Sequence, residues 1–151
     1  MAVDLRRLAT ESRRTSIQLE QFIDRYTEKL GLSAAQAHIL LYILHHSDLG
    51  TSLTQMHREF GYAMPSLCGM LKRLQKNGFV QTAACQEDGR RKLLSSTEKA
   101  AALEPQLVEA LNESNRALFR GFTEEELLQL HRLQRKMLQN ISDPQASEPQ
   151  V

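Results

Sequence analysis

The segment 64–95 constrains the fold of this chain more than any other part of its sequence. Its first half has the i, i+3, i+4, i+7 spacing of one buried helix face, at Leu67, Met70, Leu71 and Leu74. Pro65 suits the first turn of such a helix, and Gly78 suits the position just after its end. The Asp88-Gly89 pair that follows is a strong hairpin turn signal, which predicts strands over 79–84 and 92–95.

Two further helices are expected before this segment, and each begins with a capping box. Ser33-Ala-Ala-Gln36 opens a helix that continues to about Leu44, and Ser52-Leu-Thr-Gln55 opens a short helix that Gly61 closes. In this motif the serine hydroxyl and the glutamine amide satisfy backbone N–H groups that have no partner inside the helix. Helix, short helix, helix and hairpin, in this order, predict a winged helix-turn-helix over about 33–96.

Long amphipathic helices are expected on both sides of this lobe, over about 4–30 and within 97–141, where the capping box Thr123-Glu-Glu-Glu126 starts the last one. Their apolar stripes need a surface to bury them. Packing against each other covers a part, and a second subunit in a two-fold dimer covers the rest. The predicted fold class is mainly α with a small β-hairpin wing, in a single unit over 1–142 whose outer helices dimerise. A disordered tail is expected over 143–151.

The composition fits an ordinary soluble globular protein with one sizeable core, since 41% of its 151 residues are hydrophobic and 25% are charged. No apolar run approaches the roughly 18 residues of a membrane helix, and the polar N-terminus is unlike a secretory signal. Cys68 and Cys85 give no disulfide framework. We therefore expect a cytoplasmic protein with reduced thiols and no membrane partner.

The sequence contains no motif of an enzyme or of a metal site. A Gly-rich phosphate loop and a nucleophile motif are both missing. The five histidines form no His-x3-His pair, and the cysteines form no Cys-x2-Cys pair. We therefore expect no enzymatic activity, no metal and no cofactor.

The charge of the chain is unevenly distributed, although its net value is only +1. Between Leu53 and Ser95 there are seven lysines and arginines against three carboxylates, which is a net charge of +4 and leaves −3 for the rest. A basic middle between neutral-to-acidic flanks suggests a face that binds a polyanion. A solvated surface of mixed charge is the other interpretation of the same pattern.

The order of these elements resembles the MarR family of bacterial transcription regulators, along nearly the whole chain. Leu74-Gln-Lys-Asn-Gly78-Phe-Val80 is similar to the family's end of the recognition helix, and Asp88-Gly-Arg90 and Thr97-Glu-Lys follow at the expected distance. Ser96 departs from the usual leucine, which leaves the returning strand without its apolar anchor. The resemblance implies a homodimeric, sequence-specific DNA-binding transcription regulator, a repressor that a small-molecule ligand releases from a near-palindromic operator in double-stranded DNA.

A recognition helix reads base edges in the major groove with its exposed face, while cations bind phosphate without reading sequence. The residues expected on the base side are Pro65, Ser66, Cys68 and Gly69. Those expected to contact phosphate from the same helix are Lys72, Arg73 and Lys76. Ser52, Thr54 and Gln55 are expected to add phosphate contacts at the start of the preceding helix.

The wing carries three further expected DNA-binding residues, Asp88, Arg90 and Arg91. By the family's pattern, Asp88 holds one arginine through a carboxylate–guanidinium pair. Arg90 then reaches toward the minor groove, whose negative potential attracts arginine where the groove is narrow. A local ion pair that only stabilises the hairpin tip is the alternative interpretation.

Two kinds of signal could control such a protein. The resemblance implies a small apolar or phenolic ligand, for which Tyr26, His38 and Tyr42 are candidate pocket residues, although each could equally belong to the core. Thiol oxidation at Cys68 or Cys85 is the alternative, and it requires a lowered thiol pKa. An adaptor of another class remains open, a dimer whose basic face binds an acidic protein partner.

Overall fold

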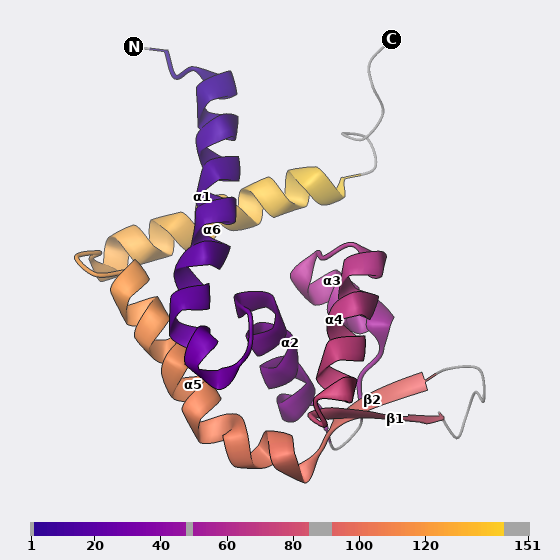
Figure 1. The fold of residues 1–151 in the computed structure, drawn as a ribbon. Coiled ribbons are helices and arrows are strands. Elements are labelled where there is room, and N and C mark those ends of the chain that lie inside the picture. Colours follow the sequence, from indigo (N-terminus) through magenta and orange to yellow (C-terminus); the bar gives the residue numbers. More distant parts are fainter. Residues whose placement is uncertain (1, 48–49, 85–91, 144–151) are drawn as a thin grey trace. The chain divides into compact units, whose positions relative to one another are not determined.

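The computed structural model describes residues 2–47, 50–84 and 92–143, and these form a mainly helical fold with one hairpin (Figure 1). In chain order the elements are α1 (Leu5–Thr27), the 3-10 turn η1 (Glu28–Leu30), α2 (Ala34–His45), α3 (Leu53–Phe60), α4 (Met64–Lys76), β1 (Val80–Ala84), β2 (Lys92–Ser96), α5 (Glu98–Leu118) and α6 (Glu124–Ser142). The fold class expected from the sequence is confirmed. The wing tip with Cys85, Asp88, Arg90 and Arg91, and all but the first residue of the expected tail, lie outside the described residues.

The chain divides into two compact units, residues 1–115 and 116–151. The first unit contains the helix-turn-helix, the hairpin, α1 and most of α5. The second unit consists of the end of α5 and the whole of α6. Among the described helices, none is long and apolar enough to cross a membrane.

The hydrophobic core of the first unit surrounds α2. This helix contacts α1, α4 and β2. Its buried residues lie on several sides of the helix, at Ala34, Ala37, Ile39, Leu40 and Ile43. Because neighbours cover α2 on more than one side, its sequence is almost continuously apolar and not striped.

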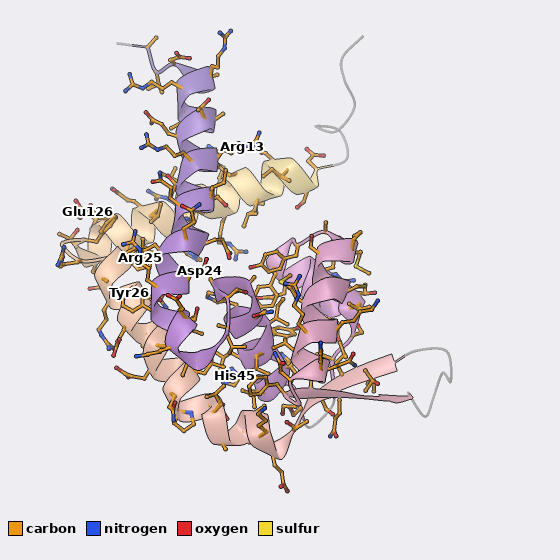
Figure 2. All side chains as sticks on the ribbon, in the orientation of Figure 1. Arg13, Asp24, Arg25, Tyr26, His45 and Glu126 are labelled. Carbon is orange, nitrogen blue, oxygen red and sulfur yellow. The ribbon has the colours of Figure 1, made fainter. Side chains whose placement is uncertain are left out.

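The helix starts follow the sequence closely. Ser33 and Gln36 form the expected capping box of α2. The Asp24 side chain on α1, labelled in Figure 2, adds a tertiary contact, since its Oδ1 accepts a hydrogen bond from the Ala34 N–H at 2.7 Å. The start of α2 is therefore fixed both by its own cap and by α1.

The two ends of α4 are stabilised differently. At its start, Ala63 provides no side-chain cap, and Pro65 lies in the first turn. At its end the chain forms a Schellman motif, in which the Phe79 N–H donates to the Leu74 carbonyl at 2.9 Å and the Gly78 N–H donates to the Gln75 carbonyl at 3.0 Å. Gly78 supplies the positive φ of 81° that this motif requires. Helix α4 thus ends at a sharply defined residue.

The wing strands pair antiparallel from Val80 opposite Ser96 to Ala84 opposite Lys92. An isolated antiparallel bridge joins Thr51, just before α3, to Leu94 on β2. The Thr51 N–H donates to the Leu94 carbonyl at 3.0 Å, and the Leu94 N–H donates to the Thr51 carbonyl at 2.7 Å. Position 96 has a serine in place of the apolar anchor, and its contacts are polar. The Ser47 and Ser96 hydroxyls share a hydrogen bond, and the Ser96 N–H donates to the Ser47 hydroxyl. The returning strand is therefore anchored to the end of α2 by hydrogen bonds.

Candidate nucleic-acid interface

Helix α4 presents two chemically distinct faces. Leu67, Leu71 and Leu74 are buried in the core. The opposite face is exposed at Pro65, Ser66, Lys72, Arg73 and Lys76, and partly exposed at Cys68 and Gly69. The buried leucines fix which side of the helix points outward, so the cations share one solvent face. This arrangement can approach a polyanion without disturbing the core.

The three residues expected to bind phosphate at the start of α3 have different environments. Ser52 is only 5% exposed, and its Oγ accepts a hydrogen bond from the Gln55 N–H at 3.3 Å. The Gln55 side chain is equally occupied, because its Oε1 accepts from the Ser52 N–H at 2.8 Å and from the Thr51 hydroxyl at 3.2 Å. Thr54 is exposed. Gln55 is exposed as well, so Thr54 and Gln55 are the two of the three whose side chains a phosphate can reach.

A cleft of about 320 Å³ lies beside the exposed face of α4. It is lined by Leu53, Cys68, Leu71, Lys72, Gln75, Thr82 and Leu94. The Cys68 thiol is free and half-buried at this cleft. The other cysteine, Cys85, belongs to the part of the wing that the structure does not describe.

The three expected ligand residues are all half-buried, but no single contact joins them. Tyr26, labelled in Figure 2, packs on Phe22 of its own helix, with ring centroids 5.5 Å apart. The His38 Nδ1–H donates to the Ala34 carbonyl at 2.8 Å. Tyr42 contacts a different set of rings, stacking on His46 and meeting the edge of Phe60. Each of the three side chains therefore has a partner within the fold.

Sequence reasoning missed a link between α1 and the turn that precedes α4. The Tyr62 hydroxyl donates to Glu20 Oε1 at 3.1 Å across 42 positions of sequence. Burial raises the pKa of Tyr62 above its ordinary value of 10.0, and the nearby negative charges of Glu20 and Asp24 raise it further. The phenol therefore stays protonated, and remains a donor, to a higher pH than an exposed tyrosine does. No local pattern could have identified this pair, because neither residue lies in a motif.

No cluster of three or more histidine, cysteine, aspartate or glutamate side chains that could hold a metal ion is found in the part of the chain that the structure describes. His45 approaches one carboxylate of α5, with its Nε2 3.4 Å from Glu104 Oε1. This pair is exposed on both sides and joins α2 to α5. It is a surface contact of the first unit.

The α3–α4 pair with its adjoining hairpin defines a winged helix-turn-helix protein. Residues 30–91 match the sequence model of the MarR family, which covers the lobe from the start of α2 into the wing. Over this segment the chain is similar to the MarR family, and the resemblance predicted from the residues is confirmed. The family match includes α4, β1 and the wing residues Asp88 and Arg90.

Solved structures with the same fold extend the likeness beyond this segment. The transcriptional regulator SlyA is 21% identical, with a TM-score of 0.79 over 89% of this chain and 94% of its own. A MarR-family regulator from Listeria monocytogenes, complexed with a 26mer DNA, is 23% identical, with a TM-score of 0.77 over 100% and 99%. MepR of S. aureus, also in a DNA complex, is 21% identical, with a TM-score of 0.78 over 89% and 96%. At these identities the likeness establishes the fold.

Proposed function

We propose that this protein is a sequence-specific regulator of transcription that binds double-stranded DNA through α4 and the wing. The observation that carries the proposal is the exposed row Lys72, Arg73 and Lys76, opposite the buried leucines of α4. A basic outer face on the second helix of a helix-turn-helix matches the chemistry of a recognition helix in the major groove. The DNA complexes of the two similar proteins from Listeria and S. aureus support the same use of the fold.

In this mechanism α4 divides its contacts between bases and phosphates. The small residues Pro65, Ser66, Cys68 and Gly69 face the base edges and allow close approach of the backbone. Lys72, Arg73 and Lys76 contact phosphate, and Thr54 adds a hydroxyl contact from α3. Asp88, Arg90 and Arg91 carry the wing's part, with Arg90 reaching toward the minor groove.

We further propose a homodimer, because both outer helices leave apolar side chains exposed. Leu5, Leu8 and Ile17 are exposed on α1. On α6 the exposed residues of one stripe are Leu127, Leu133, Met137, Leu138 and Ile141. A two-fold partner would cover such stripes and would place two recognition helices on half-sites about 34 Å apart, which favours a near-palindromic operator.

Control by a small apolar or phenolic effector, with release of a repressor from DNA, completes the proposal. Tyr26, His38 and Tyr42 supply half-buried aromatic surface in the first unit. Oxidation of Cys68 is the second candidate signal, supported by its partial exposure on the cleft beside α4, where added bulk would meet the DNA. An acidic protein partner in place of DNA is a further possible occupant of the basic face.

DNA binding can be tested with an operator selected from a random or genomic library and read by fluorescence anisotropy. The Lys72→Ala, Arg73→Ala double variant should bind more weakly and should lower the slope of log affinity against log salt by about 2, because each lost phosphate contact removes about one unit. Lys29→Met, which removes an exposed charge from η1, is the control and should bind like the wild type. An unchanged double variant, or a flat salt response, would contradict the proposal.

Dimerisation can be tested by sedimentation of two α6 variants. Leu138→Glu puts a charge in the exposed apolar stripe and should shift the protein toward monomer. Leu128 is also exposed, but it lies about 100° around the helix from Leu127, outside the stripe, so Leu128→Glu is the matched control. Equal behaviour of both variants would rule out the stripe as the interface.

A further inference from the structure

The first turn of α5 holds the end of α4 through three consecutive backbone carbonyls. Thr97 donates from its Oγ1 to the Gly78 carbonyl at 2.6 Å and from its N–H to the Phe79 carbonyl at 3.1 Å. Lys99 donates from its Nζ to the Asn77 carbonyl at 2.6 Å. A carbonyl at the end of a helix lacks a partner within it, and the Lys99 ammonium supplies one for Asn77, while Thr97 holds the two carbonyls just past the helix. We call Thr97 and Lys99 the α5 clamp.

Lys99 occupies an unfavourable position in its own helix. Helix α5 begins at Glu98, and the partial positive charge of a helix N-terminus disfavours a cation in the first turn. The same ammonium lies at the C-terminal end of α4, where partial negative charge favours it. Its Nζ also lies 4.7 Å from the centroid of the Phe79 ring, within cation–π range. The position of this lysine is therefore explained by α4 and not by α5.

The contacts of Lys99 also distinguish it from the cations on the outer face of α4. Its stem lies beside Gly78, where an added Cβ would be 3.7 Å from the lysine Cδ. Its ammonium is directed to a carbonyl and a ring of the same protein. Lys72, Arg73 and Lys76 are exposed on the α4 surface. Lys99 thus has an intramolecular role that a phosphate contact would interrupt.

The Asn77 carbonyl, which accepts from Lys99, belongs to the last turn of α4, and this turn carries Arg73 and Lys76. The Asn77 N–H donates to the Arg73 carbonyl at 3.0 Å, and Lys76 precedes Asn77 directly. Fixing Asn77 therefore restrains the backbone from which both cations project. Thr97 adds to this restraint by holding the two following residues of the Schellman motif.

We propose that Thr97 and Lys99 are positioning residues, which fix the last turn of α4 so that Arg73 and Lys76 reach the DNA, and that Lys99 does this without touching phosphate. This inference rests on the proposed DNA binding. It assigns the α5 clamp a task in recognition beyond joining two helices, because the orientation of α4 relative to α5 is set at this junction.

The test compares Lys99→Met with Lys99→Arg in the full chain, on a selected operator across a salt series. Lys99→Met should weaken binding on the order of two- to fivefold, the equivalent of a lost cation at a helix end, with the salt slope unchanged. Lys99→Arg keeps the charge and the donor and should bind like the wild type. Lys29→Met is the charge-matched control. A salt slope lowered by about one unit would make Lys99 a phosphate contact, and unchanged affinity would remove it from recognition, so either result overturns the proposal.

A second measurement needs no DNA and separates this proposal from the proposed function. Amide hydrogen exchange at Asn77 and Phe79 should be several-fold faster in Lys99→Met and close to the wild-type rate in Lys99→Arg, because the last turn of α4 opens more often. Unchanged exchange at both amides would overturn the clamp even if affinity falls. If the Lys72→Ala, Arg73→Ala variant binds DNA like the wild type while exchange still responds to Lys99→Met, the proposed DNA interface fails, and the clamp remains only as a structural contact.

Discussion

Helices α2 and α6 begin in the same way and have opposite environments. Both start with a complete capping box, formed by Ser33 and Gln36 in α2 and by Thr123 and Glu126 in α6. Five residues of α2 are buried, whereas no residue of α6 is buried. Helix α6 nonetheless carries leucines, as α2 does, and these include Leu138, which is 61% exposed.

The difference teaches that helix formation and helix burial have separate causes. A capping box satisfies the first N–H groups of a helix with residues three positions apart, so it depends on local sequence alone. Burial depends on what packs against the helix, and α2 has α1, α4 and β2 around it. The exposed apolar stripe of α6 is the observation on which the proposed dimer interface rests.

Core truncation should give the largest contrast between the two helices. Ile39→Ala in α2 should lower the free energy of unfolding by about 2–5 kcal/mol, because it leaves a cavity in a fully buried site. Leu138→Ala in α6 should lower it by an amount that grows with protein concentration, since only a dimer buries that side chain. Denaturant unfolding at two protein concentrations measures both. A concentration-independent loss for Leu138→Ala would contradict the assignment of α6.

Removing the N-caps should cost less stability than core truncation, and the cost should be similar in the two helices. Ser33→Ala and Thr123→Ala each remove the hydroxyl that accepts from the backbone N–H three residues on, at 3.1 Å in both helices. Each should cost about 1 kcal/mol. In α2 the loss should appear in global unfolding, because the helix is part of the core. In α6 it should appear as faster amide exchange over the first turn, and a loss in global unfolding there would contradict this difference between the two helices.

The hydrogen bond from Tyr62 to Glu20, which links α1 to the helix-turn-helix, should give the smallest effect. Its contribution to stability should change only at high pH. Because the pKa of Tyr62 is raised in the folded protein, the folded state holds the phenolic proton more tightly than the unfolded state. The stability from this group is complete below pH 10 and is lost as the pH rises above 10 toward the folded-state pKa. Phenolate absorbance, taken as the difference between wild type and Tyr62→Phe, should therefore appear only well above pH 10. Ionisation of Tyr62 at pH 10 would contradict the burial and the bond to Glu20.

Local rules predicted the capped helix starts and the end of α4 well. The capping boxes at Ser33, Ser52 and Thr123 all form, and Gly78 ends α4 in the conformation that only glycine adopts readily. The buried face of α4 also follows its spacing. These features depend on residues a few positions apart, so the sequence contains all the information they need.

Interactions between distant residues could not be predicted in the same way. Ser96 seemed to lack an anchor by comparison with the family's leucine, yet it is bonded to Ser47, 49 positions away. The phosphate contacts expected of Ser52, Thr54 and Gln55 stay predictions, although Ser52 and Gln55 Oε1 also make the cap contacts of α3. The base-side residues of α4 and the wing residues stay predictions, since a contact with DNA depends on a second molecule.

The sequence by itself determined where the helices begin and end, which face of α4 is apolar, and that a basic winged helix-turn-helix occupies the middle of the chain. These properties follow from hydrogen bonds and side-chain spacing within a few residues. Only the tertiary structure decided that Lys99 serves the end of α4, that Tyr62 bonds to Glu20 and that serines anchor the returning strand. The physical reason is that each of these contacts joins backbone or side-chain groups that the chain brings together only after its helices have packed.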